Sequence, residues 1–176
     1  MPQIRIVRTD DLSAAELDDV RALLVAGFDG NFSDDDWQHA LGGWHVIATD
    51  GAPLAHAALV ARTLEVGGRR LRAGYVEGVT TLAPWRHQGL GTAVMRPVGT
   101  LLAAEFELGA LSTGSHAFYG RLGWERWQGP TYVRRGDDLV RTAEEDDGIM
   151  VLRYRGTARL GLDQPITCED RPGDPW

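Results

Sequence analysis

Hydrophobic and polar positions recur with different periods along the chain, and these periods predict its opening elements. Residues 4–8 alternate with a period of two, which predicts a strand. The next segment begins with Ser13-Ala-Ala-Glu16, the pattern of a capping box, and continues with leucine and valine at helical spacing. Residues 33–41 predict a second, short helix with Ser33 as its N-cap. The chain therefore opens with one strand and two helices.

Three apolar runs rich in β-forming residues follow these helices. They cover residues 44–49, 54–66 and 71–82. Asp50-Gly51 and Gly67-Gly68 separate the runs, and both dipeptides are typical of tight hairpin turns. This pattern predicts an antiparallel meander of three strands.

The middle of the chain changes to helical spacing. Residues 89–108 are apolar and helix-like, but Pro97 and Gly99 predict a kink or an early end of this helix. A short strand is expected at 109–112, and a further helix from residue 116 to residue 122.

Three more strands are predicted to close the fold around an acidic loop at 136–148. They cover residues 124–127, 130–134 and 149–154. The tail from residue 169 onward has little signal for regular structure and ends on a tryptophan that we expect to be exposed. The order of elements predicts the α/β (α+β) class with a mixed sheet. A length of 176 residues fits a single domain, 1–176.

Composition excludes several classes of function. The chain has 25 acidic and 18 basic residues, a net charge of -7, and all its basic residues are arginine. This balance disfavours nucleic acid as a partner and favours a cation. No apolar run reaches the ~18 residues of a membrane span, and the first residues lack the layout of a secretory signal, so we expect a cytoplasmic protein without a membrane partner. The histidines and the single cysteine lack metal-ligand spacing, so no metal site is expected.

A glycine-rich turn between the meander and the long helix carries the clearest chemical signal. It reads Arg86-His-Gln-Gly89-Leu-Gly91. Glycine permits positive φ and close backbone approach, so several N–H groups at a helix start can converge on an anion. The turn lacks the Gly-Lys-Ser/Thr ending of a Walker A loop and is not G-x-G-x-x-G. It predicts a pyrophosphate site, and a simple strand-to-helix turn is the alternative interpretation of the loop taken alone.

The loop, the strand before it and the segment Phe118–Trp124 resemble the Gcn5-related N-acetyltransferase (GNAT) superfamily. The resemblance implies a GNAT fold, with a mixed central sheet whose central strands splay apart between flanking helices, and acetyl-CoA (coenzyme A) as cosubstrate. The backbone of Val79 would polarise the acetyl carbonyl, and Tyr119 would reprotonate the departing thiolate. The residues implied to bind acetyl-CoA are Val79, Thr81, Arg86, His87, Gln88, Gly89, Leu90, Gly91 and Thr92.

Four further segments look like the aminoglycoside 2′-N-acetyltransferases, a family within this superfamily. They are 32–43, 74–79, 108–112 and 173–176, and the resemblance extends over essentially the whole chain. It implies transfer of acetyl from acetyl-CoA to the 2′-amine of a cationic aminoglycoside, by an enzyme that is often a homodimer. The residues implied to contact this substrate are Asp36, Glu77, Ser112, Asp147, Asp174 and Trp176 with its carboxylate. Asn31 departs from the family pattern, because close relatives have an acid there.

Two chemical requirements match these residues. An ammonium group must lose a proton before it attacks a thioester, and Glu77 lies in an apolar strand where partial burial makes a carboxylate more basic. A cleft lined with carboxylates also suits a polycation. The register of the acidic loop leaves Asp146 and Asp147 as alternatives for one contact. Other acids are predicted to face solvent: Asp34, Asp35, Asp137, Asp138, Glu144 and Glu145.

Two other functions are compatible with the sequence. One is a GNAT acetyltransferase for another cellular amine or amino sugar, which needs the same acidic acceptor cleft. The other is a catalytically silent protein that binds acetyl-CoA or a cation. The presence of both Glu77 and Tyr119 favours an enzyme over a silent binder.

Overall fold

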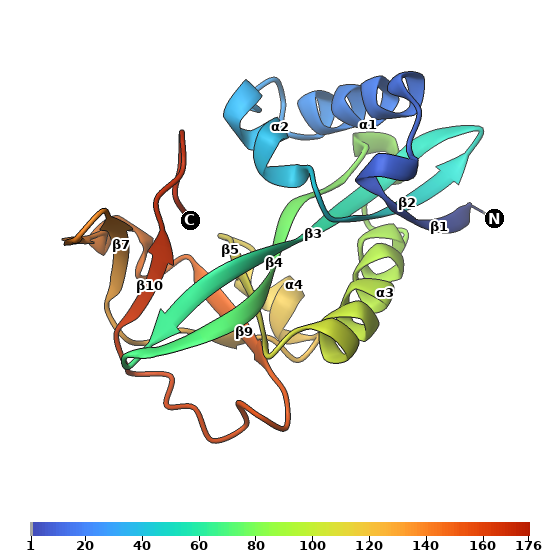
Figure 1. Ribbon diagram of the computed structural model, residues 1–176. Helices are drawn as coiled ribbons and strands as arrows, with labels where there is room; N and C mark the ends of the chain where they lie inside the picture. Colours follow the sequence, from blue (N-terminus) through green and yellow to red (C-terminus); the bar gives the residue numbers. More distant parts are fainter. Residues whose placement is uncertain (1) are drawn as a thin grey trace. The chain divides into compact units, whose positions relative to one another are not determined.

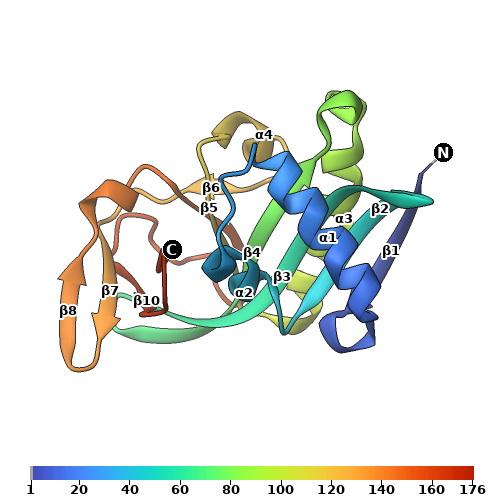
Figure 2. The same cartoon turned by 90° about the horizontal axis from the view of Figure 1, so that it is seen from above.

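The computed structural model describes residues 2–176, which form two compact units (Figures 1 and 2). The first unit comprises the chain up to Val60 together with Val76–Leu101, and the second comprises Ala61–Tyr75 and Leu102–Trp176. Strands β3 (Ala52–Val66) and β4 (Arg69–Thr81) contribute residues to both units. The expectation of a single domain stays a prediction.

The three strands of the predicted meander are neighbours in the order β2 (Trp44–Asp50), β3, β4, and the opening strand β1 (Gln3–Arg8) adds to the β2 side. In the first unit, β1 pairs antiparallel with β2, and β2 pairs antiparallel with the first part of β3. Gly51 makes the turn between β2 and β3 with a φ of 83°. Only glycine adopts this conformation without strain, which explains the Asp50-Gly51 dipeptide.

Helices α1 (Ala14–Gly27) and α2 (Asp34–Ala40) both begin with a complete capping box. Figures 1 and 2 show both helices on one face of the unit's sheet and α3 (Leu90–Glu105) on the other. Burial of apolar side chains holds α1 and α2 to the sheet. The buried residues of this core are Leu12, Val20, Leu24, Trp37, Ala40, Ile47 and Ala58.

Helix α3 runs through Pro97 without interruption, so of the two expected outcomes, a kink or an early end, the early end was wrong. A proline inside a helix costs roughly 3 kcal/mol, because it removes an N–H donor and crowds the preceding turn. Val94, Met95 and Val98 on the same helix are all buried. Full burial of each such side chain contributes about 1.5–3 kcal/mol, which offsets the cost of the proline. Among residues 2–176, no helix is long and apolar enough to cross a membrane.

The sheet of the second unit is mixed, as predicted. Strand β5 (Leu108–Ser112) runs parallel to β4, but the pairing covers only Ala73–Tyr75 of β4 and ends there. Such an early end is what the predicted splay of the central strands requires. On its other side β5 pairs antiparallel with β9 (Ile149–Arg153), which in turn pairs with β6 (Glu125–Arg126).

Two strands of the second unit were not predicted. Strand β8 (Asp138–Arg141) lies inside the expected acidic loop, where it forms a hairpin with β7 (Thr131–Arg135). Strand β10 (Ile166–Glu169) pairs antiparallel with β3 and parallel with β7. The remaining short elements are α4 (His116–Gly120) and the 3-10 helices η1 (Thr9–Asp11), η2 (Ala83–Trp85) and η3 (Ala143–Glu145).

Candidate active site

The backbone at the start of α3 forms a glycine-containing turn in the first unit, at the place where the sequence predicts a pyrophosphate site. His87 and Gly89 have φ values of 64° and 85°. The first bond of the helix runs from the Ala93 N–H to the Gly89 carbonyl at 2.9 Å, which leaves the N–H groups of residues 90–92 without a partner inside the helix. These groups and the positive end of the helix dipole suit a pyrophosphate. A Cβ added at Gly89 would meet nothing within 4 Å, so the turn is open to a ligand.

The side chain of Arg86 supports this turn. Its Nε donates to the Thr81 carbonyl and its Nη2 to the Gly27 carbonyl, each at 3.1 Å. Gln88 adds a bond from Nε2 to the Pro84 carbonyl at 2.9 Å. These side chains tie the turn to the ends of β4 and α1, so they orient the backbone that the sequence assigned to acetyl-CoA.

Glu77 and Val79 lie on either side of an irregular position in β4. Both residues are half-buried, and Gly78 between them has a φ of 55°. A Cβ at Gly78 would approach the Leu24 Cδ2 atom to 3.0 Å, a tight contact, and the positive φ disfavours any other residue, so this position favours glycine. The left-handed residue interrupts the alternation of side chains along the strand at the predicted catalytic glutamate.

Asp36 has a structural task in the first unit. Its Oδ2 atom accepts hydrogen bonds from the Ser33 N–H and the Ser33 hydroxyl, both at 2.8 Å. Asp36, which the sequence predicts to contact the substrate, therefore caps helix α2. The cap fixes the orientation of its carboxylate.

Tyr119 is buried on α4 of the second unit, with 7% of its surface exposed. Its ring packs edge-on against Phe118 and Trp124, with centroid distances of 4.9 and 6.0 Å. Burial raises the pKa of the phenol above its ordinary value, so the hydroxyl keeps its proton at neutral pH. This is the state that a proton donor needs, although the ring contacts are also those of a core tyrosine.

Ser112 lies beside a carboxylate that the sequence reasoning placed in solvent. The Ser112 hydroxyl donates to Glu145 Oε2 at 3.4 Å. Burial and the nearby charge of Asp174 raise the pKa of Glu145. The prediction that Glu145 faces solvent was wrong, because η3 turns its side chain toward β5. Only the folded loop reveals this residue, since its neighbours in sequence are equally acidic.

The prediction that Asp35 faces solvent was also wrong, because this residue is half-buried on α2. The other predicted solvent-facing acids are exposed: Asp34, Asp137, Asp138 and Glu144.

The two alternative acids of this loop have different surroundings. Asp146 is bonded to the Arg141 guanidinium and accepts from the Thr131 N–H and hydroxyl at 3.0 and 2.9 Å. These bonds, with that of Arg141 the strongest, lower the pKa of Asp146 to about 2. The side chain of Asp147 is 96% exposed and pairs with Arg126 at 3.2 Å. Asp146 therefore holds the loop together, whereas Asp147 is accessible to a substrate.

The C-terminal segment is ordered, and the expectation that it ends on an exposed tryptophan was wrong. Trp176 is 4% exposed, and its Nε1 donates to the Thr142 hydroxyl at 3.0 Å. Its backbone N–H donates to Asp174 Oδ1 at 2.9 Å, which orients that carboxylate. The Pro175 carbonyl accepts from Arg62 at 2.8 Å. These hydrogen bonds hold the C-terminal segment against the rest of the second unit. Sequence patterns do not reveal them.

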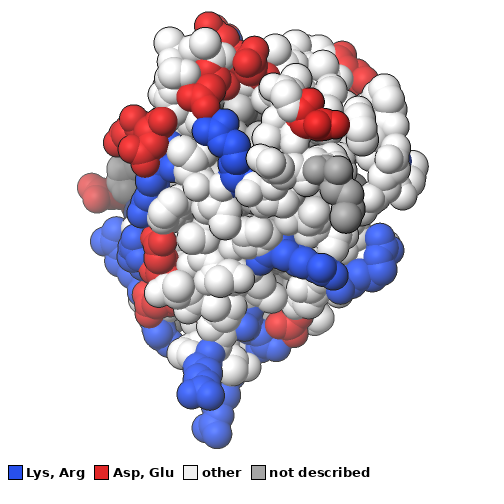
Figure 3. All heavy atoms as spheres, turned by 90° about the vertical axis from the view of Figure 1, so that its right-hand side faces the viewer, with Lys and Arg blue, Asp and Glu red and all other residues white. Residues whose placement is uncertain are grey.

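Acidic and basic side chains are interspersed over the face shown in Figure 3, so this face has no uniform acidic surface.

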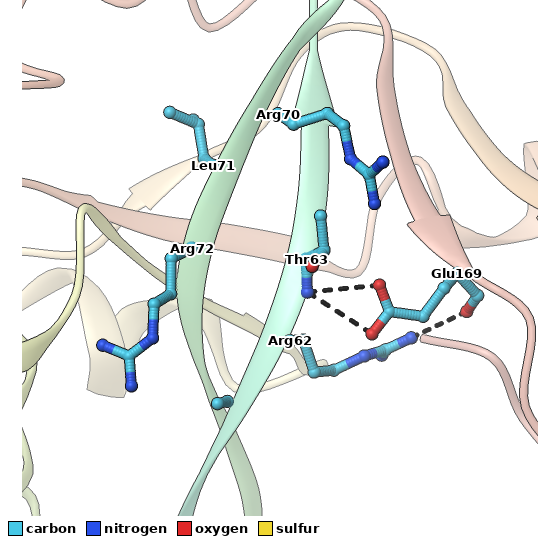
Figure 4. Close-up of a pocket in the computed structure, with 7 residues that line it drawn as sticks. Arg62, Thr63, Arg70, Leu71, Arg72 and Glu169 are labelled. Carbon is cyan, nitrogen blue, oxygen red and sulfur yellow. Dashed lines mark hydrogen bonds between the residues drawn. The ribbon is translucent and has the colours of Figure 1, made fainter.

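A pocket of about 450 Å³ lies in the second unit (Figure 4). Arg62 and Thr63 in its wall are bonded to Glu169, through the Glu169 carbonyl at 2.9 Å and its carboxylate at 3.1 Å. The pocket lining contains none of the predicted site residues; it is formed by Ala61, Arg62, Thr63, Arg70, Leu71, Arg72 and Glu169.

A family model described as Acetyltransferase (GNAT) domain matches residues 8–127. The chain belongs to this family. This GNAT protein is 45% identical over 177 residues to an aminoglycoside 2′-N-acetyltransferase of Mycolicibacterium fortuitum, with 98% of this chain and 91% of the relative covered. The predicted family, fold class and enzyme class are thereby confirmed.

Solved structures share the fold of this GNAT protein. YhbS of Escherichia coli, solved in complex with CoA, matches with a TM-score of 0.66 and 19% identity over 95% of this chain and 89% of its own. A GCN5-related N-acetyltransferase from Kribbella flavida matches with a TM-score of 0.59 and 24% identity over 73% of this chain. The match covers 34% of the K. flavida chain, so this chain corresponds to about a third of that protein.

Proposed function

We propose that this GNAT protein is an aminoglycoside 2′-N-acetyltransferase that uses acetyl-CoA. The 45% identity to the M. fortuitum enzyme over 98% of this chain is the observation that carries the proposal. The N–H groups at the start of α3 support it, because they suit the pyrophosphate of coenzyme A.

Acetyl-CoA supplies the thioester acetyl group when bound. The turn from Arg86 to Thr92 would hold the pyrophosphate through backbone N–H groups, and the end of β4 at Val79 and Thr81 would pair with the pantetheine arm. The N–H groups of residues 90–92, which have no partner inside the helix, and the open space at Gly89 fit this role.

Three groups of the chain would perform the chemistry. Glu77 accepts a proton from the substrate ammonium through water, which leaves the amine free to attack the acetyl carbonyl. The Val79 N–H donates to the carbonyl oxygen, where negative charge develops. Tyr119 would donate its proton to the sulfur as the C–S bond breaks, and the second proton of the attacking nitrogen, released as the amide forms, would restore the phenol through solvent; the buried, protonated hydroxyl supports this role.

Carboxylates would bind the ammonium groups of the aminoglycoside. Asp36, Asp147, Asp174 and Trp176 are the proposed contacts, with Ser112 as a neutral hydrogen-bonding partner. We add Glu145, because it is bonded to Ser112 and is close enough to Asp174 for their charges to interact. The homodimer and the cytoplasmic location stay predictions.

Two antibiotics test the reaction and its position. Thiol release from acetyl-CoA is measured with purified protein and either tobramycin, which has a 2′-amine, or kanamycin A, which has a hydroxyl there. Turnover with tobramycin alone is the expected result. Equal turnover with both would contradict the 2′ position. No turnover with either would point to another amine acceptor or to a silent binder.

Replacing Glu145 with Gln is expected to raise the KM for tobramycin by about 10-fold, because a hydrogen bond to a charged group contributes roughly 1.5 kcal/mol. Initial rates at saturating acetyl-CoA measure the change. Glu144→Gln is the matched control, since Glu144 is an exposed neighbour on the same 3-10 helix. Equal effects of the two substitutions on KM would show that only the net charge of the loop matters.

A further inference from the structure

A chain of hydrogen bonds in the first unit ends at the residue between Glu77 and Val79. The Thr9 hydroxyl lies 2.8 Å from His45 Nε2, His45 Nδ1 lies 2.9 Å from His56 Nε2, and His56 Nδ1 lies 2.8 Å from the Gly78 carbonyl oxygen. Both histidines are fully buried, with 0% of their surface exposed. The reaction proposed above uses neither of them.

The Gly78 carbonyl oxygen determines which atom donates and which accepts in every hydrogen bond of this chain. A carbonyl oxygen only accepts, so His56 carries its proton on Nδ1 and donates it to Gly78. The neutral ring then accepts at Nε2 from the Nδ1–H of His45, which in turn accepts at Nε2 from the Thr9 hydroxyl. The Gly42 N–H donates to the Thr9 oxygen at 2.9 Å and completes the chain. Burial keeps both rings neutral by lowering the pKa of His45 to about 4 and that of His56 to about 3.

The histidine pair holds the carbonyl of a residue whose backbone departs from regular strand geometry. Gly78 has a φ of 55°, outside the range of a regular strand. Leu24 of α1 lies against the Cα of Gly78, and His56 of β3 binds its carbonyl. Because the Gly78 carbonyl and the Val79 N–H belong to one planar trans peptide, they point in opposite directions. Fixing the carbonyl on His56 therefore fixes the direction of the Val79 N–H.

We infer that His56, held by His45 and Thr9, is a positioning residue that aims the Val79 N–H at the acetyl carbonyl of acetyl-CoA. The inference rests on the proposed function, since that function makes the Val79 amide the donor to the carbonyl oxygen. His56 touches neither acetyl-CoA nor the amine; it acts through the backbone of Gly78.

Two substitutions at one position separate positioning from packing. In His56→Asn the side-chain amide nitrogen takes the place of Nδ1 and still donates to Gly78, whereas in His56→Gln the amide reaches the place of Nε2 and leaves Gly78 without a donor. Two quantities are measured for each protein: kcat with tobramycin, and the ratio of the Kd values for CoA and acetyl-CoA. The ratio of the Kd values reports the contact to the acetyl carbonyl and does not require turnover.

We expect His56→Gln to lower kcat roughly 10-fold or more and to reduce the preference for acetyl-CoA over CoA, with KM for tobramycin within about twofold of wild type. His56→Asn should keep both quantities within about threefold. Wild-type values of both quantities in His56→Gln would overturn the inference, and so would equal losses in the two variants. If wild-type protein acetylates no aminoglycoside, the proposed function fails, and the affinity ratios alone decide the inference.

Two milder substitutions at Thr9 test the inference if His56→Gln does not fold. Thr9→Ser keeps the hydroxyl that donates to His45, and Thr9→Val removes it from a half-buried site. Thr9→Val should lower kcat and the affinity ratio in the same direction as His56→Gln, while Thr9→Ser leaves both near wild type. Identical values for Thr9→Val and wild type would overturn the inference.

Discussion

Replacing Glu77 with Gln is expected to lower kcat for tobramycin by about 100-fold or more, because general base catalysis contributes roughly 10²–10⁴-fold. Glutamine keeps the size of the side chain but cannot accept a proton at neutral pH. The proposed base acts on the amine and not on the cofactor, so the Kd for acetyl-CoA should stay within about twofold of wild type. Steady-state rates and calorimetric titration with acetyl-CoA measure the two effects separately.

Glu65→Gln is the matched control for this variant. Glu65 is also a half-buried strand glutamate, on β3, and its partner is Arg134 at 3.1 Å. This substitution should leave kcat near wild type, since Glu65 has no proposed part in the reaction. Equal losses of turnover and of acetyl-CoA binding in Glu77→Gln would contradict the base role.

Lowering the pH from 6.5 to 5 is expected to reduce the free energy of unfolding by roughly 3 kcal/mol through His45 and His56, because the slope reaches its full value only about one pH unit below the unfolded pKa. Burial lowers their folded-state pKa values to about 4 and about 3, whereas an unfolded histidine titrates near pH 6.5. Between these values the unfolded state binds more protons, so stability is full above about pH 6.5 and falls by about 1.4 kcal/mol per pH unit for each histidine. Urea titrations at several pH values measure this slope.

The two carboxyls with lowered pKa values do not contribute in this range of pH, whereas Glu145, whose pKa is raised, acts in the opposite direction and does so equally in wild type and in the histidine variants. The carboxyl pKa values of Glu16 and Asp146 are lowered to about 2, so their contributions are lost only below about pH 4.5. His56→Asn should remove about half of the slope, whereas His87→Asn, at an exposed site with a left-handed backbone that Asn tolerates, should keep all of it. Parallel slopes in wild type and His56→Asn would refute the assignment of the acid sensitivity to the buried pair.

Local patterns in the sequence were sufficient for most of the elements. Ser13 and Ser33 mark the starts of α1 and α2 because a capping box is formed by residues only three apart. The turns at Gly51 and Gly67-Gly68 were readable for the same reason, since their positive φ values suit glycine. The glycine-rich turn before α3 was also readable, since Gly89 has a positive φ, although Arg86 ties this turn to the distant Gly27 carbonyl.

Long-range contacts decided the features that the sequence reasoning missed. Strand β10 is only four residues long and exists because β3 and β7 supply partners on both sides. Helix α3 continues through Pro97 because packing outweighs a local penalty. Neither partners nor packing are visible in a pattern of neighbouring residues.

The candidate site divides in the same way. The sequence by itself determined the family, and it offered the glycine-rich turn, Glu77 and Tyr119 as candidates, since motifs and spacing carry that information. Only the tertiary structure distinguished Glu145 beside Ser112, Asp146 under Arg141 and the exposed Asp147, three neighbouring acids that a sequence cannot tell apart. It alone joined His45 to His56 and Gly78, because a hydrogen bond between strands depends on register and burial, which the folded chain sets as a whole.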